Sequence, residues 1–230
     1  MLIDLHSGRE TAICGSLSSG TAWATAASEC VAAASGIPVV SLGSKYVHPN
    51  VAAEMDYAAI VGGCASCSTT QGARLSGVTP SGNMPHVLPL LMGDMSKAMQ
   101  AFDTHMPQEV PRVALVGTFG DESEEALGVA RLMGERLRGI RVDTPPERGG
   151  VTVDLIREIR GRLDQSGFSH VEIMVTGNFT PEKIREFVLA EAPVNIFGVD
   201  SYIAKAPSNA FSAEIQEIEG RPFSRRGRVP

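Results

Sequence analysis

Apolar residues in the second half of the chain recur in two alternating patterns, one typical of strands and one typical of helices. Short apolar runs predict buried strands, and apolar positions three or four apart between them predict helices. The expected strands are 112–117, 140–143, 171–175 and 195–198, and the expected helices are 122–137, 152–167 and a third from Thr180. Strand and helix alternate about every 28 residues, which predicts βα units with parallel strands.

Threonine and proline mark where two of these helices should begin. Thr152 and Thr180 stand where an N-cap is expected, and Pro181 takes the first helical position after Thr180. The first half is less regular. It predicts helices at 11–35, 51–57, 66–75 and 93–105, and strands at 37–43 and 58–63. The whole pattern favours an α/β fold, either a (β/α) barrel or most of one, with an open doubly wound sheet as the alternative.

One domain accounts for the length of 230 residues. We expect an N-terminal helical region at 1–36, βα units at 37–203, and a basic, extended tail at 204–230. No apolar run is long enough to span a membrane, and the first residues do not resemble a signal peptide, so a cytoplasmic protein is expected. In that compartment the four cysteines should be free thiols. Cys64 and Cys67 form a lone CxxC motif, and without a second such pair nearby it does not indicate a zinc site.

Charge is distributed unevenly along the chain. The net charge of −6 gives no reason to expect nucleic-acid binding. Residues 1–105 hold only four of the 20 lysines and arginines, namely Arg9, Lys45, Arg74 and Lys97. The alanine-rich segment 20–36 also has small residues on most faces, so it should pack closely on more than one side. It lies either inside the fold or against a partner subunit, and the second alternative predicts a homo-oligomer.

Polar residues that could carry chemistry cluster at the expected carboxyl ends of the strands, where parallel barrels bind their ligands. Pro80, Gly82 and Pro85 exclude regular structure before His86, so a loop should present this histidine at a strand end. His86 could transfer a proton or contact a phosphate, or it could be satisfied by the backbone. Asp143 could bind a sugar hydroxyl or a magnesium-bound phosphate, or it could cap a loop or pair with Arg148.

Several segments together resemble the nicotinate phosphoribosyltransferase family from about Glu10 to Arg228. They are Val61–Thr69, Pro80–His86, Phe102–Arg112, Arg141–Gly149, Val175–Ile184 and Phe197–Ile203. The resemblance implies an irregular TIM-like barrel of the type II phosphoribosyltransferase kind, similar to quinolinate phosphoribosyltransferase, with sites at a dimer interface. It also implies transfer of phosphoribose from phosphoribosyl pyrophosphate with Mg²⁺ to a pyridine carboxylate or related base, in NAD biosynthesis.

The resemblance assigns roles to individual positions of this chain. His86 falls on the catalytic-loop histidine of the family, and Asp143 falls on an aspartate near the ribose. No protein ligand for a metal is expected. Gly177 and Gly198 fall on the phosphate loops of the family. Together with the polar residues at the expected strand ends and the loops after them, the predicted substrate-binding residues are Lys45, His48, Thr118, Arg148, Thr176, Gly177, Asn178, Gly198, Asp200 and Ser201.

The chain also departs from the family pattern. The N-terminal domain of the family is not found, so a separate subunit could complete the site. This chain has Ser19 where the family has a histidine, Lys45-Tyr46 where it has two arginines, and Asn83 where it has a threonine. It has Gly117 where the family has an aspartate and Asp200 where the family has a glycine. Three hypotheses follow: a working transferase, an impaired paralogue that binds a nucleotide or a partner, and a barrel recruited to another phosphorylated or carboxylated molecule with Asp200 as a new polar contact.

Overall fold

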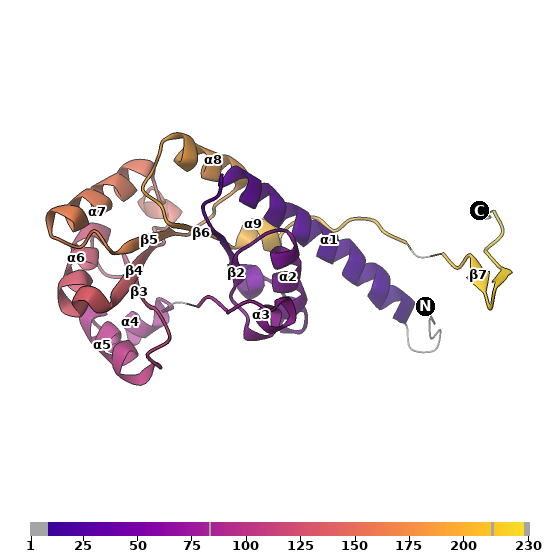
Figure 1. Cartoon of the computed structure of the whole chain (residues 1–230), viewed down its shortest axis with the longest axis horizontal. Helices are drawn as coiled ribbons and strands as arrows, with labels where there is room; N and C mark the ends of the chain where they lie inside the picture. The colour runs from indigo at the N-terminus through magenta and orange to yellow at the C-terminus, as the bar shows by residue number, and fades with distance from the viewer. Residues whose placement is uncertain (1–8, 83, 213, 228–230) are drawn as a thin grey trace.

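A curled sheet of six parallel strands forms the centre of the molecule (Figure 1). The computed structural model describes residues 9–82, 84–212 and 214–227. The strand order is β2-β1-β6-β5-β4-β3, so β2 and β3 are the edges of the sheet in the described part of the chain. The strands are β1 (Val39–Ser41), β2 (Ser66–Cys67), β3 (Arg112–Val116), β4 (Leu137–Val142), β5 (Glu172–Val175) and β6 (Ile196–Val199). The sheet makes half of a barrel, which confirms the barrel prediction over the doubly wound alternative.

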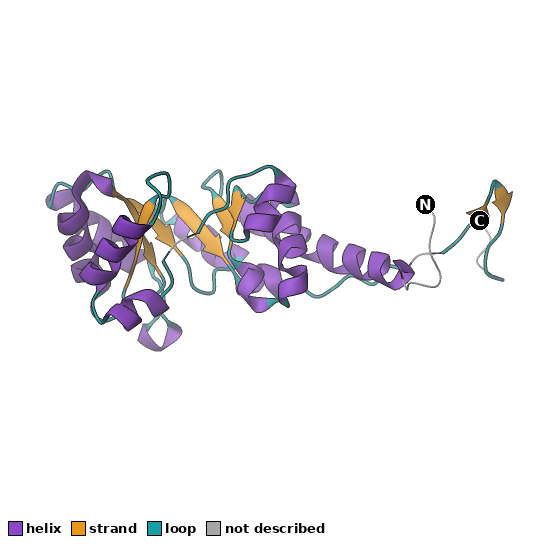
Figure 2. Ribbon diagram, turned by 90° about the horizontal axis from the view of Figure 1, so that it is seen from below, coloured by secondary structure: helices purple, strands orange, loops and turns teal. Residues whose placement is uncertain are grey.

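Helices lie on both sides of the strands, at the left and the right of Figure 2. The helices α6 and α7 pack on each other, and α6 contacts β3 and β4, while α1 contacts α2, α8 and α9. Among the described residues, no helix has the length and apolar character needed to cross a bilayer. The helices are α1 (Arg9–Ala33), α2 (Pro49–Val61), α3 (Thr70–Ser76), α4 (Val87–Met92), α5 (Met95–His105), α6 (Glu122–Met133), α7 (Val153–Gln165), α8 (Pro181–Leu189) and α9 (Ser201–Ala204).

The predicted caps of α7 and α8 are confirmed. The Leu155 backbone N–H donates to Thr152 Oγ1 at 3.2 Å, and the Lys183 N–H donates to Thr180 Oγ1 at 3.4 Å. Each bond satisfies an amide that has no partner inside its own helix, and Pro181 needs no such partner. Local chemistry therefore fixes where these two helices begin.

Three segments were assigned wrongly from the sequence. Residues 58–61, predicted as the start of a strand, form the last turn of α2, because the alanines there favour a helix and the helix stops only at Gly62 and Gly63. The strand of this region is β2, inside the stretch predicted as helix 66–75. Leu137 begins β4 and does not end α6, because Gly134 has a positive φ of 56° that breaks the helix.

The small residues of α1 serve close packing within the chain. A Cβ at Gly62 would lie 2.3 Å from the Ala24 carbonyl oxygen and 2.7 Å from the Ala27 Cβ. Ala27 and Cys30 are fully buried, whereas Thr25 is exposed. One side of α1 is thus internal, and burial of its exposed side against a partner stays a prediction.

The C-terminal tail leaves the sheet and runs beyond α1 (Figure 1). It was predicted to be extended, and it contains a short antiparallel hairpin of β7 (Glu217–Ile218) and β8 (Arg221–Pro222). Gly220, with φ of 77°, makes the turn between these two strands.

Three aromatic rings join the loop after β5 to α8 and β6. The Phe179 ring centroid lies 5.2 Å from that of Phe187 and 5.5 Å from that of Phe197. All three side chains are almost fully buried. Edge-to-face packing of this kind adds about 0.5–1.5 kcal/mol per pair beyond burial, so the cluster holds the strand ends at fixed positions.

We predict opposite effects of a glycine-to-alanine change at two positions. At Gly198, inside β6, a Cβ would lie 2.5 Å from Thr176 Cγ2 and 2.8 Å from Leu42 Cδ1, so Gly198→Ala should cost about 1–3 kcal/mol of unfolding free energy. At Gly128, inside α6, a Cβ would meet nothing within 4 Å, so Gly128→Ala should add about 0.5–1 kcal/mol. Denaturant unfolding of both variants measures these changes, and equal effects would contradict the packing at Gly198.

Candidate active site

The carboxyl ends of the six strands meet at one edge of the sheet, because all the strands are parallel. Most of the candidate residues predicted from the sequence lie there. Lys45 follows β1, Thr118 follows β3, Asp143 follows β4, Thr176 follows β5 and Asp200 follows β6. The predicted residues therefore lie on neighbouring strands.

A buried arginine connects the ends of β4 and β5. Arg141, 8% exposed, donates through Nε to Thr176 Oγ1 at 2.9 Å and forms an ion pair with Asp143 through Nη2. The Thr176 N–H donates to the Val142 carbonyl oxygen at 2.9 Å. Gly177 is required beside this pair, because a Cβ there would lie 2.9 Å from Asp143 Oδ1 and its φ is 98°.

His86 reaches the site from the start of a helix. The sequence predicted a strand end, but His86 is the residue before α4, and the apolar run after it is helical. Its Nδ1 lies 3.0 Å from Thr118 Oγ1, so the loop after β3 orients the imidazole ring.

The surroundings of His86 favour its neutral form. Burial lowers the pKa of His86 most; the Asp143 carboxylate raises this pKa and the Arg141 guanidinium lowers it. Glu125 raises it and Lys45 lowers it by smaller amounts. A neutral imidazole at pH 7 can accept a proton or a hydrogen bond, which suits contact with a reacting group.

The loop that carries Thr118 is held by one carboxylate. Glu125 accepts backbone N–H groups from Gly117, Thr118, Phe119 and Gly120 at 2.8–3.2 Å. Charge-assisted bonds of this kind are stronger than bonds between neutral groups. Glu125 therefore fixes the position of Thr118 and, through it, of His86.

Arg148 has a different partner from the one considered in the sequence. The possible ion pair between Asp143 and Arg148 is not formed, because Arg141 takes Asp143. Arg148 Nη2 lies 3.2 Å from Glu122 Oε2, and Thr144 Oγ1 donates to Glu122 Oε1 at 2.8 Å. Glu122 is 3% exposed, so these contacts compensate for burying its charge.

The residues Lys45, Tyr46 and Asp200 form one cluster. Lys45 Nζ lies 3.1 Å from Asp200 Oδ2, and the Tyr46 hydroxyl donates to the same oxygen at 3.5 Å. The Ser201 N–H donates to Asp200 Oδ1 at 2.6 Å. Two positions that depart from the family pattern are thus in contact with each other.

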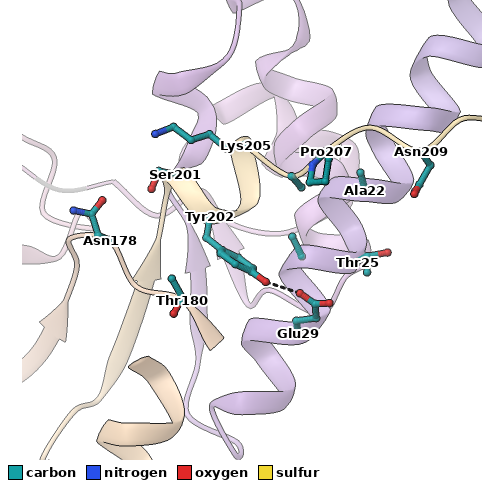
Figure 3. A pocket seen from close by; sticks show the side chains of 12 residues that line it. Ala22, Thr25, Glu29, Asn178, Thr180, Ser201, Tyr202, Lys205, Pro207 and Asn209 are labelled. Carbon is teal, nitrogen blue, oxygen red and sulfur yellow. Dashed lines mark hydrogen bonds between the residues drawn. The ribbon is translucent and has the colours of Figure 1, made fainter. Parts of the chain in front are cut away.

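A cavity of about 590 Å³ opens beside the ends of β5 and β6 (Figure 3). Asn178 and Ser201 line it on the side of the strands, and Ala22 and Thr25 line it on the side of α1. The Tyr202 hydroxyl donates to Glu29 Oε2 at 2.7 Å across it, and this bond is the main cause that raises the pKa of Tyr202 to about 12.

Three further residues predicted to bind substrate, His48, Gly198 and Thr176, also make contacts within the protein. His48 is exposed and caps α2, because its Nδ1 accepts the Asn50 N–H at 3.2 Å. Gly198 lies within β6, where its neighbours leave no room for a side chain. Thr176 is buried, and its hydroxyl also donates to the Val142 carbonyl oxygen at 3.3 Å. Their roles in substrate binding stay predictions.

No group of three or more histidine, cysteine, aspartate or glutamate side chains that could hold a metal ion occurs in the part of the chain that the structure describes. The Asp143 carboxylate supplies oxygen of the kind that Mg²⁺ prefers, and its Oδ2 is paired with Arg141. One carboxylate fits Mg²⁺, which usually takes its remaining ligands from water and substrate phosphates.

Sequence reasoning missed Arg141 and Glu125 as organisers of the site. A signal for Arg141 was present, because it stands two positions before Asp143 and so faces the same side of an apolar strand. Glu125 gave no such signal, since it lies in the first turn of a helix, where acidic residues are common.

Residues 23–213 match the family described as quinolinate phosphoribosyl transferase, C-terminal domain. Nicotinate phosphoribosyltransferase pncB1 of Mycobacterium tuberculosis is 27% identical over an alignment of 230 positions. The alignment covers 94% of this chain and 49% of that protein. This chain spans about half the length of the curated relatives it matches.

Solved structures of related proteins have the same fold. A nicotinate-nucleotide pyrophosphorylase from Pyrococcus furiosus is 41% identical, with a TM-score of 0.84 over 96% of this chain and 56% of that chain. Human nicotinic acid phosphoribosyltransferase has a TM-score of 0.66 over 91% of this chain and 51% of that chain. At 17% identity, the human structure supports the fold alone.

We predict that Asp143→Asn lowers the pKa of His86 further. The substitution removes a negative charge that raises this pKa and leaves Arg141, which lowers it. Titration of the imidazole signals by NMR measures the change, and His86→Gln identifies the signal. Asp154→Asn is the matched control, because the Asp154 side chain is 95% exposed on α7. An unchanged or higher pKa in Asp143→Asn would contradict this electrostatic arrangement.

Proposed function

The chain belongs to the quinolinate phosphoribosyltransferase family, because residues 23–213 match the C-terminal domain of that family. On this premise we propose that it takes part in phosphoribosyl transfer. The substrates would be phosphoribosyl pyrophosphate and a pyridine carboxylate such as nicotinate, or a related base. The named relatives act in this chemistry, and this supports a role in pyridine nucleotide and NAD synthesis. A cytoplasmic location is part of the same proposal.

The observation that carries the proposal is the arrangement of His86, Thr118, Arg141 and Asp143 at the carboxyl edge of the sheet. A carboxylate–guanidinium pair at the end of β4 and a neutral imidazole at the start of α4 belong to the matched region. These groups offer a hydrogen-bond acceptor, a negative charge and a buried cation within one site. Such a set can orient a phosphorylated sugar and stabilise charge that develops on it.

In the proposed reaction, a ring nitrogen of the base forms a bond to C1 of the ribose. The bond between C1 and the pyrophosphate oxygen breaks, and pyrophosphate leaves with the electron pair. Positive charge develops on the ribose, and the negative charge of Asp143 would favour it. His86 would contact the reacting phosphoribosyl group, held by Thr118.

The proposal includes Mg²⁺, which would neutralise the charge of the pyrophosphate when bound. Asp143 is the residue of this site that best fits contact with the ion. The remaining candidates, Lys45, His48, Arg148, Asn178 and Ser201, would contact the substrate around this centre. A separate polypeptide that completes the site also remains part of the proposal.

We predict that His86→Ala lowers the rate of pyrophosphate release by about a hundredfold or more, because it removes the group placed at the reacting centre. The assay supplies phosphoribosyl pyrophosphate, Mg²⁺ and nicotinate, and a panel of pyridine and azole acids follows. His170→Ala is the matched control, since His170 is exposed at the amino end of β5 and packs beside Phe168. Activity that persists in His86→Ala would contradict the role of His86, and calorimetric binding of phosphoribosyl pyrophosphate separates lost binding from lost chemistry.

We predict a homo-oligomer at micromolar concentration. The helix α4 exposes Val87, Leu90 and Leu91 directly after His86, with Leu91 79% exposed, and such apolar groups are typical of contact surfaces. Light scattering should give a mass above that of one chain, and Leu91→Glu should shift it toward one chain. Leu189→Glu, at a position 83% exposed on α8, should leave the mass unchanged. A monomeric wild-type protein would contradict the prediction.

A further inference from the structure

Asp200 is a buried carboxylate at the carboxyl end of β6, and its contacts come from three groups. The residue is 5% exposed. Its Oδ1 accepts the Ser201 N–H at 2.6 Å, and its Oδ2 lies 3.1 Å from Lys45 Nζ and accepts from the Tyr46 hydroxyl at 3.5 Å. A backbone amide, an ammonium group and a hydroxyl therefore surround one carboxylate.

These are the kinds of donor that bind a phosphate. Backbone N–H groups, lysine and hydroxyl groups are common anion contacts in proteins, and at this strand end they are already taken by a side chain of the protein. A buried carboxylate needs such partners, since an unpaired buried charge is costly. A phosphate that entered here would have to displace Asp200 from them.

We propose that Asp200 is a specificity-determining residue that acts as an internal anion. It occupies the donors at the carboxyl end of β6, keeps the substrate phosphate away from them, and selects a hydroxyl group of the sugar as its neighbour. The carboxylate can accept a hydrogen bond from a hydroxyl, whereas it repels a phosphate. The inference rests on the proposed function, because it states which part of a phosphoribosyl substrate lies beside β6.

The size of the effect follows from the charges. A carboxylate about 5 Å from a phosphate charge repels it enough to weaken binding by roughly a hundredfold at an effective dielectric constant of 20. Lys45 offsets part of this repulsion, but its side chain is 52% exposed, so water and salt weaken its contribution. Removing the Asp200 charge should therefore tighten phosphate binding by roughly tenfold to a hundredfold.

Asp200→Asn is the variant that isolates the charge. It keeps the shape of the side chain and an oxygen that can accept the Ser201 N–H. The released Lys45 becomes available to the phosphate, so the gain in affinity should shrink when Asp200→Asn is combined with Lys45→Ala. Asp154→Asn makes the same change in net charge at a position 95% exposed on α7 and is the matched control.

The experiment is calorimetric titration of the full chain with ribose 5-phosphate and, separately, with ribose. We expect Asp200→Asn to bind ribose 5-phosphate at least tenfold more tightly than wild type. The gain should fall at high ionic strength, while ribose binding stays equal or weakens and Asp154→Asn behaves as wild type. Equal or weaker binding of ribose 5-phosphate by Asp200→Asn would overturn the proposal, as would no binding by either protein. Thermal unfolding checks that each variant is folded.

A turnover assay separates this inference from the proposed function. If wild type releases pyrophosphate in a manner that depends on His86 but Asp200→Asn gains no affinity, the role of Asp200 is refuted and the transferase function stands. If no turnover occurs but Asp200→Asn binds ribose 5-phosphate more tightly, the transferase function fails and the exclusion of phosphate by Asp200 stands.

Discussion

The site depends on the contacts of one buried side chain, the guanidinium group of Arg141. A charged group at 8% exposure must be compensated by nearby partners, and here they are the Asp143 carboxylate and the Thr176 hydroxyl. These partners lie at the ends of two different strands, so one side chain fixes both. Gly177 completes the arrangement, because only a residue without a Cβ fits against Asp143 at that φ. The loop after β5 is consequently held from the inside of the site.

The rest of the edge is held by aromatic packing and by the Glu125 carboxylate. Phe179, Phe187 and Phe197 fix the loop after β5 against α8 and β6. Glu125 gathers the amides of the loop after β3, and the residue it positions, Thr118, orients His86. The groups that would contact a substrate are therefore ordered before any substrate binds. Such order reduces the entropy lost on binding and favours electrostatic stabilisation of developing charge.

The sequence predicted those parts of the structure that local chemistry decides. The strands β3 to β6 and the caps Thr152 and Thr180 follow from short-range pattern and were confirmed. The strand expected at 58–63 failed, because an apolar run rich in alanine fits a helix equally well and tertiary packing against α1 decided the outcome. The contact between Lys45 and Asp200 could not be predicted, because the two residues are separated by most of the chain and meet only through the pairing of β1 with β6.

Charge balance along the carboxyl edge links these observations. Asp143 is paired with Arg141, Asp200 with Lys45 and Glu122 with Arg148, while Glu125 accepts four backbone amides. A phosphorylated ligand that uses any of these cations must compete with a carboxylate of the protein. Its binding free energy is then a difference between two sets of charge contacts, which makes it sensitive to single substitutions. Under the proposed function, a pyrophosphate whose charge is reduced by Mg²⁺ meets less repulsion at this edge than the free anion does.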